Sequence, residues 1–362
     1  MLEQIYRKIL RRRGLSLWQL AAFGAWLLSF GYRLGYYLAR LLPIRSVKVP
    51  VPVISVGNVT VGGTGKTPTV ACLASHLVDD GIRVGIVSSG YGRANKKASF
   101  VCPGYQVQEM PTADTGDEVK LLSHLLPQAV FSVAAAKSEA TVRLTSAIEV
   151  DVILVDDGFQ HRRLYRDIDL VTFDLAVPDR MLKWFPLGLL REPLSALKRA
   201  DMIIGTRSNF ARDLSLQRDR LRRLSPQAEL YSAQFLTTEL VGPADRRPLK
   251  YLEDKSVFLF AGIGNFKPLR HQVAALCADL DQALELSDHQ RYDQALLERI
   301  QVMVARHDSD VILTTGKDWV KLPDFAFDRE IYYLGQTIDL DPGEETLLRS
   351  LKQHLDLHRQ ER

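Results

Sequence analysis

The chain has 362 residues, which is enough for about two domains of ordinary size, and an apolar content of 46% excludes a disordered protein. Its formal net charge of +4 is distributed unevenly, because residues 1–48 carry nine Lys or Arg residues and a single acid, Glu3. A basic N-terminal end on a slightly acidic body argues against a nucleic-acid-binding protein and favours contact with an anionic membrane surface.

The first predicted element is an apolar segment near the N-terminus. Residues 14–32, GLSLWQLAAFGAWLLSFGY, contain no charge and are flanked by arginines. Their number reaches the lower end of the range for a membrane span, whereas the aromatic and basic residues that follow suit the headgroup layer. We predict a membrane-associated helix within residues 1–48, either spanning the bilayer or lying in its surface, with a buried core helix as the alternative. No clear signal-peptide cleavage site follows, and export would separate a phosphate-binding loop from ATP, so we expect the helix at the cytoplasmic face.

A strand, a glycine-rich loop and a helix are predicted next. Residues 49–58, VPVPVISVGN, are a β-branched run of the kind that forms a buried parallel strand. VGGTGKTP follows at residues 61–68, and Pro68 can begin a helix because its missing N–H is not needed there. The next residues keep helical spacing up to Gly81. This succession is the context that a phosphate-binding loop requires.

The loop departs from the common spelling Gly-x-x-x-x-Gly-Lys-[Ser/Thr], since Thr60 occupies the position of the first glycine. The remaining glycines still allow backbone N–H groups to surround phosphates, Lys66 can reach the β and γ oxygens, and the Thr67 hydroxyl can ligate Mg²⁺. The residues predicted to bind ATP are Thr60, Val61, Gly62, Gly63, Thr64, Gly65, Lys66 and Thr67.

A pair of acids follows a later strand. Asp156 and Asp157 come directly after the apolar residues 152–155, so their carboxylates are expected at the C-terminal edge of a sheet, where α/β proteins bind ligands. Such a pair can hold the Mg²⁺ of a nucleotide directly or through water. Paired acids after a strand can also only cap a turn, but the phosphate-binding loop earlier in the chain favours the metal site.

The remaining pattern indicates an α/β fold of the P-loop NTPase type. Apolar strands alternate with helical stretches, as in a parallel sheet covered by helices on both faces. A polar, proline-containing linker then leads into a second strand–helix series. We predict a membrane anchor helix in residues 1–48, a P-loop domain in 49–227, and a linker with a smaller α/β domain in 228–362. The predicted strands of the P-loop domain are 51–56, 84–88, 129–133, 151–156, 168–174 and 201–205.

Seven short segments carry a resemblance to a known family. They are SVGNVTVGGTGKTP at 55–68, GYG at 90–92, TGDE at 115–118, DDGFQHRRLYRD at 156–167, LREP at 190–193, DH at 288–289 and TTGKD at 314–318. Their identity and order resemble the tetraacyldisaccharide 4′-kinases, from the basic N-terminus to about residue 322. The resemblance implies transfer of the γ-phosphate of ATP to the 4′-hydroxyl of a tetraacyl disaccharide 1-phosphate, which gives the bisphosphorylated lipid A precursor at the cytoplasmic face of the bacterial inner membrane.

The resemblance also implies roles for individual residues. Asp117 corresponds to the catalytic base, which accepts the proton of the sugar hydroxyl, and His289 to its partner in an Asp–His pair. Without the family, Asp117 and Glu118 read as acids that complement a helix dipole, and His289 as a surface histidine. Because the two catalytic positions fall in different predicted domains, we expect the pair to form when the cleft between the domains closes. The further residues implied in substrate or phosphate contacts are Asn58, Tyr91, Glu118, Gln160, His161 and Arg191, the last with a salt bridge to Glu192 or a neighbour as the alternative.

Several positions depart from the family pattern. Ser89 replaces an arginine for which Arg93 is close enough to substitute, Lys137 replaces another arginine, and Gly316 replaces a glutamate. These changes affect the acceptor contacts more than the reaction class. Two other functions remain open: a P-loop ATPase of the partitioning or metal-chaperone type, against which Val61 stands in place of that group's signature lysine, and a non-catalytic nucleotide-binding scaffold. The expected partners are the acylated disaccharide and the membrane surface; neither nucleic acid nor an obligate protein partner is expected.

Overall fold

The computed structural model describes residues 17–264, 266–288, 290–322 and 325–360. The predicted catalytic residue His289 and the basic end before residue 17 lie outside the described residues. The chain folds into two compact units, and each combines segments that are distant in sequence. The first unit consists of Met1–Lys66, Val152–Gln234 and Leu340–Arg362, and the second of Thr67–Asp151 and Phe235–Asp339.

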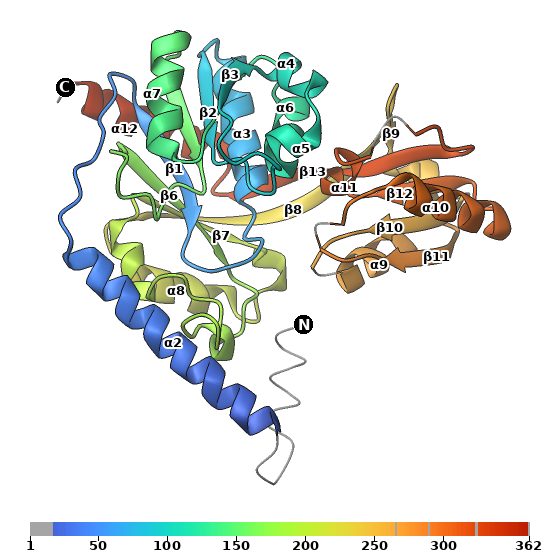
Figure 1. The fold of residues 1–362 in the computed structure, drawn as a ribbon, viewed down its shortest axis with the longest axis horizontal. Coiled ribbons are helices and arrows are strands. Elements are labelled where there is room, and N and C mark those ends of the chain that lie inside the picture. The colour runs from blue at the N-terminus through green and yellow to red at the C-terminus, as the bar shows by residue number, and fades with distance from the viewer. Residues whose placement is uncertain (1–16, 265, 289, 323–324, 361–362) are drawn as a thin grey trace. The chain divides into compact units, whose positions relative to one another are not determined.

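The first unit is built on a parallel sheet with the strand order β5, β1, β6, β7, β8. Every residue of β1, β5, β6 and β7 is buried, as expected of parallel strands that are covered on both faces. On one face Val171 and Ile203 pack with Leu221 of α8, which lies near β7 in Figure 1. The elements are α2 (Leu17–Leu41), β1 (Val53–Asn58), β5 (Val152–Asp156), β6 (Ile168–Asp174), η1 (Asp179–Met181), η2 (Leu194–Arg199), β7 (Met202–Thr206), η3 (Ser208–Phe210), α8 (Leu214–Leu224), the first part of β8 (Glu229–Val241) and α12 (Glu344–Gln360).

Helix α2 docks on the first unit along one side. The Ser29 hydroxyl donates to the Trp184 carbonyl oxygen at 3.1 Å. Further along the helix, the Tyr36 hydroxyl and the Arg40 guanidinium donate to the Glu192 carboxylate at 3.4 and 3.1 Å. The spacing of these three helical residues follows the period of about 3.6 residues that places them on one face. A buried acid, with a side chain that is 4% exposed, therefore anchors the C-terminal half of α2.

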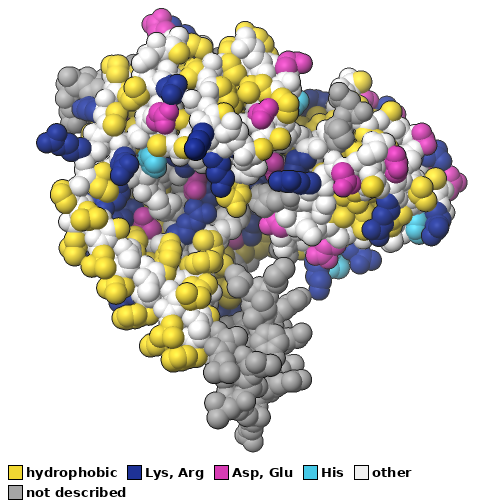
Figure 2. Space-filling model, viewed as in Figure 1, with side chains coloured by type: hydrophobic (Ala, Val, Ile, Leu, Met, Phe, Trp, Pro, Cys, Tyr) yellow, Lys and Arg dark blue, Asp and Glu magenta, His cyan; other side chains and the backbone are white. Residues whose placement is uncertain are grey.

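The other side of α2 is apolar and open. Phe23, Trp26, Phe30, Leu34 and Leu38 are each between 49 and 58% exposed, and Figure 2 shows hydrophobic side chains gathered along this helix. Such a continuous apolar surface is unusual on a protein that meets only water. Within the described part of the chain, no helix combines the length and the apolar character needed to cross a bilayer.

The second unit contains two groups of strands. In one, β2 pairs in parallel with β4, and β4 pairs antiparallel with β3. In the other, β11, β10, β12 and β13 are parallel neighbours in that order, and β9 pairs antiparallel with β8. The elements are α3 (Lys66–Asp79, which begins at the boundary between the units), β2 (Val84–Ser88), β3 (Phe100–Pro103), α4 (Gly104–Glu109), α5 (Thr112–Thr115), α6 (Asp117–Leu125), β4 (Val130–Val133), α7 (Lys137–Ala147), β9 (Arg246–Pro248), η4 (Leu249–Leu252), β10 (Ser256–Ala261), α9 (Phe266–Ala274), β11 (Asp279–Glu285), α10 (Gln294–His307), β12 (Val311–Thr314), α11 (Gly316–Trp319) and β13 (Glu330–Asp341).

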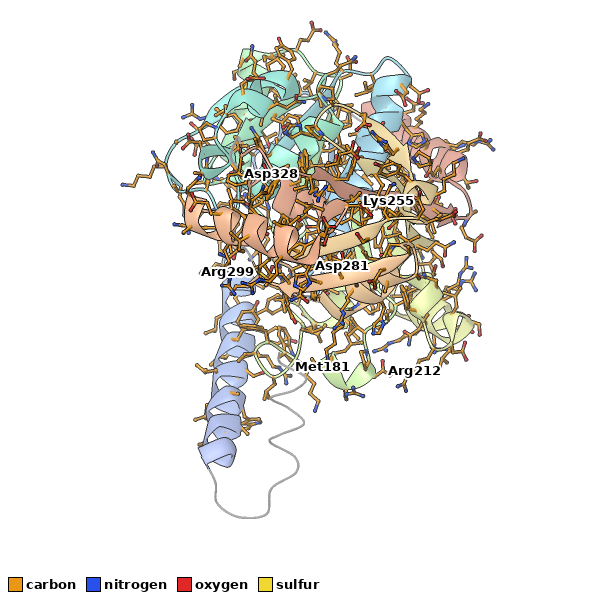
Figure 3. The ribbon with its side chains drawn as sticks, turned by 90° about the vertical axis from the view of Figure 1, so that its right-hand side faces the viewer. Met181, Arg212, Lys255, Asp281, Arg299 and Asp328 are labelled. Atoms are coloured by element: carbon orange, nitrogen blue, oxygen red, sulfur yellow. The ribbon has the colours of Figure 1, made fainter. Side chains whose placement is uncertain are left out.

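Strand β10 is the centre of the second group of strands and is buried on both faces. Val257 and Leu259 pack into one apolar cluster. Phe258 points to the other face, where it meets Leu297 and Ile300 of α10, the helix that carries Arg299, labelled in Figure 3. Alternate residues of a strand point to opposite faces, so a run of apolar residues fills two cores at once.

The predicted strands are confirmed with small shifts of their ends. The ranges 84–88 and 168–174 coincide with β2 and β6, and 51–56 moves to Val53–Asn58. The division into units differs from the predicted domains, because the predicted P-loop domain contributes to both units. Asp117 and the segments that flank position 289 belong to the same unit, where α11 packs against α6. The structure thus gives no basis for assigning these two parts of the chain to separate domains.

Gly57 in β1 lies against the segment that follows β5. A Cβ atom at this position would lie 2.4 Å from the Cβ of Phe159 and 2.8 Å from its backbone nitrogen. Gly158 is equally close to β1, since a Cβ there would lie 2.7 Å from the Ser55 hydroxyl oxygen. The two glycines allow residues 156–159 to pack directly on the end of β1.

We expect Gly57→Ala to destabilise the protein by about 1–3 kcal/mol, because the new methyl group overlaps backbone as well as side-chain atoms of Phe159. Urea denaturation followed by circular dichroism measures the change. Gly24→Ala in α2 is the matched control: no atom lies within 4 Å of its added Cβ, so its midpoint is expected to stay equal or rise, since alanine is the better helix former. A Gly57→Ala protein with an unchanged midpoint would contradict the close packing.

Candidate active site

Polar residues end several strands of the first unit at one edge of its sheet. Asn58 ends β1, Asp156 ends β5, Asp174 ends β6 and Thr206 ends β7. The strands are parallel and in register, with Val56 opposite Asp156 and Asp174 opposite Thr206. This carboxyl edge is where α/β sheets bind ligands.

Side chains from three strands hold the glycine-rich loop through Thr64. Its hydroxyl accepts from Asn58 Nδ2 at 3.0 Å and lies 2.7 Å from the Thr172 hydroxyl. The Thr206 hydroxyl donates to the Thr64 carbonyl oxygen at 3.0 Å. All four residues are buried, so these hydrogen bonds compete little with water and fix the loop relative to β1, β6 and β7.

Arg207 adds a charged contact to the same loop. Its Nη2 donates to the Gly63 carbonyl oxygen at 2.8 Å, and its Nη1 donates to Asp174 Oδ2 at 2.7 Å. Burial raises the pKa of the Asp174 carboxyl, while the Arg207 charge opposes that rise. The guanidinium therefore connects the end of β6 to the backbone of the loop.

Thr60 is compatible with the loop because its position does not demand glycine. It is 3% exposed and is not among the non-glycine residues with a positive φ. Thr60 pairs with Leu190 in an antiparallel bridge, and the next residue, Val61, donates its N–H to the Leu189 carbonyl oxygen at 2.6 Å. Within the loop, the residues that adopt a positive φ are glycines: Gly62 at 106° and Gly65 at 85°.

Two cations meet at the Asp157 carboxylate. Lys66 Nζ lies 3.4 Å from Oδ1, and Arg191 Nη1 lies 3.0 Å from Oδ2. Asp157 follows β5 directly and has a left-handed backbone with a φ of 54°. The alternative for Arg191, a salt bridge with Glu192 or a neighbour, is met by Asp157. The Glu192 carboxylate binds Arg40 and Arg199.

The residues after the acidic pair connect the segment to β1. Gln160 Nε2 donates to the Asn58 carbonyl oxygen at 2.6 Å. His161 takes part through its backbone: its N–H donates to the Gly158 carbonyl oxygen at 2.8 Å and its own carbonyl oxygen accepts from Arg166 at 2.7 Å. The structure thus brings Asn58, Gln160 and the glycine-rich loop together.

The predicted acceptor-side residues lie in the second unit. Asp117 is the first residue of α6. Its Oδ2 lies 4.0 Å from Lys321 Nζ, and its side chain is 18% exposed. Gly116 before it has a φ of 89°, and a Cβ there would lie 2.6 Å from the carbonyl oxygen of Tyr91. Tyr91 itself is 70% exposed. Two of the segments noted in the sequence, 90–92 and 115–118, therefore touch through a glycine.

Arg93 does not take the place of the arginine that Ser89 replaces. It is 2% exposed and donates to the carbonyl oxygens of Ala98 at 2.6 Å and Lys96 at 3.1 Å. Its burial lowers the pKa of the guanidinium. The arginine holds its own loop together instead of facing a substrate.

The residues that contact the predicted site residues and hold them in place were not identified from the sequence. Thr172, Thr206 and Arg207 hold the glycine-rich loop. Lys317 and Lys321 contact the acids that begin α6, with Lys317 Nζ 2.9 Å from Glu118 Oε1. Polar residues at the ends of the predicted strands 168–174 and 201–205 were the available signal for the first three. Lys317 belongs to the TTGKD segment at 314–318, but nothing in that segment indicates its contact with Glu118, and no pattern in the sequence marks Lys321.

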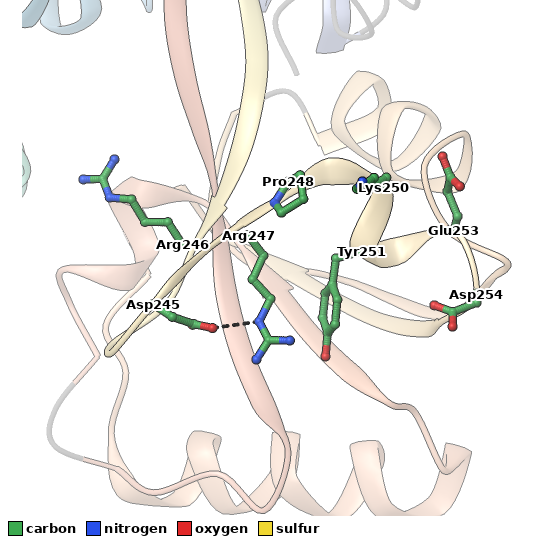
Figure 4. Close-up of a pocket in the computed structure, with 8 residues that line it drawn as sticks. All are labelled: Asp245, Arg246, Arg247, Pro248, Lys250, Tyr251, Glu253 and Asp254. Carbon is green, nitrogen blue, oxygen red and sulfur yellow. Dashed lines mark hydrogen bonds and ion pairs between the residues drawn. The ribbon is translucent and has the colours of Figure 1, made fainter.

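A shallow hollow of about 610 Å³ lies elsewhere in the second unit, around β9 and η4 (Figure 4). Two of its charges pair with each other, since Arg247 Nε binds Asp245 at 2.7 Å. The Arg247 guanidinium also lies 4.3 Å from the centroid of the Tyr251 ring. No predicted site residue lines it. The lining residues are Asp245, Arg246, Arg247, Pro248, Lys250, Tyr251, Glu253 and Asp254.

The parallel sheet, the loop with its lysine and the acidic pair at the carboxyl edge define a phosphate-transferring protein of the P-loop class. The family model described as Tetraacyldisaccharide-1-P 4′-kinase matches residues 17–356. The chain belongs to this family, and its function is tetraacyldisaccharide 4′-kinase activity in lipid A biosynthesis. This assignment sets aside both the partitioning-type ATPase and the non-catalytic scaffold.

Relatives of known name agree with the family assignment. The tetraacyldisaccharide 4′-kinase of Pelobacter propionicus is 34% identical over 294 residues, 80% of this chain and 79% of that protein. The enzyme of the same name from Syntrophus aciditrophicus is 36% identical over 290 residues, 77% of each chain. The crystal structure of LpxK from Aquifex aeolicus in complex with ATP covers 93% of this chain and 98% of its own, with a TM-score of 0.72 and 25% identity.

We expect Arg207→Gln to raise the apparent KM for the phosphate donor about tenfold, because a charge-assisted hydrogen bond to the loop backbone is worth about 1.5–3 kcal/mol. Steady-state kinase assays at varied donor concentration measure this. Arg212→Gln is the control, since Arg212 is an exposed arginine (labelled in Figure 3) in the loop before α8. Equal KM values for both variants would show that Arg207 does not stabilise the loop.

Proposed function

We propose that this chain transfers the γ-phosphate of ATP to the 4′-hydroxyl of the tetraacyl disaccharide 1-phosphate at the cytoplasmic face of the inner membrane. The observation that carries the donor side is the convergence of Lys66 and Arg191 on Asp157 beside the glycine-rich loop. Both cations are already placed at the edge where a bound polyphosphate would need them. The ATP in the Aquifex aeolicus structure supports ATP as the donor.

On the donor side, the loop backbone and the two cations bind the phosphates. The N–H groups of residues 62–67 surround the phosphate oxygens, as in other loops of this type. Lys66 then contacts the β and γ phosphates, and the guanidinium of Arg191 can bind a phosphate through two hydrogen bonds. Asp157 balances these cations before the nucleotide binds, which keeps them in place.

Thr67, Asp156 and Asp157 would hold Mg²⁺. Their donor atoms are a hydroxyl and carboxylates, the oxygen-only set that Mg²⁺ prefers. Asp156 is 3% exposed and Thr67 is 8% exposed, so both are shielded from bulk water. When bound, Mg²⁺ neutralises charge on the β and γ phosphates.

On the acceptor side, Asp117 accepts the proton of the 4′-hydroxyl. As that O–H bond breaks, the 4′-oxygen bonds to the γ-phosphorus and the bond from the γ-phosphorus to the bridging oxygen of ADP breaks. In this proposal His289 hydrogen-bonds Asp117, while Glu118 and the exposed Tyr91 contact the acceptor. The burial of most of the Asp117 side chain limits the access of competing water.

Incubation of the purified protein with Mg-ATP and the tetraacyl disaccharide 1-phosphate tests the reaction directly. We expect transfer of the γ-phosphate to the lipid and little ATP turnover without it. Absence of phosphorylated lipid, under conditions in which a relative of the same family is active, would refute the proposal. ATP hydrolysis that does not depend on the lipid would point instead to an ATPase.

Two variants distinguish the proposed role of Lys66 in binding ATP from the proposed role of Asp117 as the base. Asp117→Asn should lower kcat by about 10²–10⁴-fold, the usual contribution of a general base, with nucleotide affinity unchanged. Lys66→Met should lower the affinity for ATP, because it removes the cation that contacts its phosphates. Titration of each variant with a fluorescent ATP analogue, alongside the transfer assay, measures both effects. An Asp117→Asn enzyme with normal kcat would exclude Asp117 as the base.

We further propose that α2 lies in the membrane surface, where an acceptor with four acyl chains resides. Its docked side leaves the apolar residues Trp26, Phe30 and Leu34 on the opposite side, at helical spacing. Arg33, which is exposed on the same helix, suits anionic headgroups. A helix in this position would bring the enzyme to its lipid substrate.

The double variant Trp26→Ser/Phe30→Ser should bind anionic phospholipid vesicles at least about tenfold more weakly, since each buried aromatic side chain contributes about 1.5–3 kcal/mol. Vesicle sedimentation measures the binding. Val302→Ser in α10 provides the control, because it removes an exposed apolar side chain of 59% exposure outside α2. Unchanged binding of the double variant would show that this surface does not enter the membrane.

A further inference from the structure

A buried polar cluster in the second unit surrounds Asp318, the third residue of α11. Its side chain is 0% exposed. Its Oδ2 accepts from the Gly262 backbone N–H at 3.0 Å and from the Thr315 hydroxyl at 2.7 Å. A buried carboxylate needs such partners, because burial without them would cost several kcal/mol.

Lys321 supplies the positive charge that balances the buried Asp318 carboxylate. Its Nζ lies 2.9 Å from Asp318 Oδ1, and its side chain is 9% exposed. The same ammonium lies 4.0 Å from Asp117 Oδ2 and 5.5 Å from the centroid of the Tyr292 ring. One cation of low exposure therefore lies between two carboxylates: that of Asp318, which is fully buried, and that of Asp117, which begins α6.

The turn that carries Lys321 makes other contacts with the start of α6 and with α5, the helix before it. Lys317 binds Glu118 at 2.9 Å, and the Thr112 hydroxyl donates to the Val320 carbonyl oxygen. The Lys317–Glu118 pair is 41 and 31% exposed, so solvent screens it. The Lys321–Asp117 pair is more buried and is screened less.

The cluster also reaches the segment before α10. Burial and the Asp318 charge raise the pKa of the Tyr292 hydroxyl. A Cβ on Gly262 would lie 2.7 Å from the Ser287 carbonyl oxygen and 3.2 Å from Asp318 Oδ1. Contacts with two neighbouring segments thus hold Asp318 in place. Asp318 in turn binds Lys321, whose ammonium lies near Asp117.

We propose that Lys321 is a positioning residue for the reaction: held by buried Asp318, its ammonium orients the Asp117 carboxylate toward the acceptor hydroxyl. The inference rests on the proposed role of Asp117 as the base. A base that is free to rotate spends less time within hydrogen-bonding reach of the hydroxyl, and misplacement by about 1 Å can cost about 10²-fold in rate. Lys321 touches neither substrate in this proposal and acts only through Asp117.

The test compares Lys321→Met and Lys321→Arg with a matched control. Lys321→Met should lower kcat at least about tenfold with the KM for ATP within about twofold, and Lys321→Arg should recover part of the loss. Lys255→Met is the control: Lys255, labelled in Figure 3, also lies near an aspartate, Asp254, at 3.6 Å and a tyrosine ring, Tyr251, at 5.6 Å. Its kcat should not change. Normal kcat in a folded Lys321→Met enzyme would overturn the proposal.

Two further variants test whether the loss of kcat comes from misfolding and whether it depends on Asp117. Lys321→Met leaves Asp318 as a buried charge without a counter-ion, which can by itself prevent folding. The double variant Lys321→Met/Asp318→Asn removes both charges and is assayed if the single variant does not fold. The double variant should show the same loss of kcat. In an Asp117→Asn background, Lys321→Met should cause no additional loss. An additional loss as large as in the natural enzyme would overturn the positioning role. An active Asp117→Asn enzyme would instead refute the proposed base.

Discussion

The carboxyl edge of the sheet in the first unit depends on one electrostatic interaction, that of the Asp157 carboxylate with Lys66 and Arg191. Two cations held close together repel each other, and the carboxylate removes this repulsion before any phosphate is present. Its position follows from the packing of the backbone, because Gly158 and Phe159 lie directly against β1. The charge arrangement of the site is therefore a consequence of how closely β5 and β1 approach.

Much of this edge could be predicted from the sequence. The β-branched strands, the glycine-rich loop and the acids after β5 are local patterns, and the order of parallel strands places them at one edge. The contacts of Thr206 and Arg207 with the loop could not be predicted, because they depend on the register between β6 and β7. The same holds for Thr60: the motif marked it as a departure, and only its pairing with Leu190 explains why it fits.

In the second unit, prediction from the sequence is limited in a different way. The sequence offers two interpretations of Asp117 and Glu118: acids that complement a helix dipole, or acids of a reacting site. Their position at the start of α6 fits both interpretations, which are compatible with each other. The lysines that meet them come from a turn about two hundred residues later, as in the pair of Lys317 with Glu118. No periodicity links such distant segments, so the expected division into two domains separated residues that the fold groups in one unit.

The docking of α2 has a consequence for how the protein can be handled. Glu192 is buried under this helix, where Tyr36 and Arg40 bind its carboxylate, and Arg162 donates to the carbonyl oxygens of Ala39 and Leu42 at the end of α2. Truncation of the helix to improve yield would expose an acid directly beside Arg191 and leave it with fewer cations. The N-terminal helix is thus an integral part of the catalytic fold and not a detachable tail.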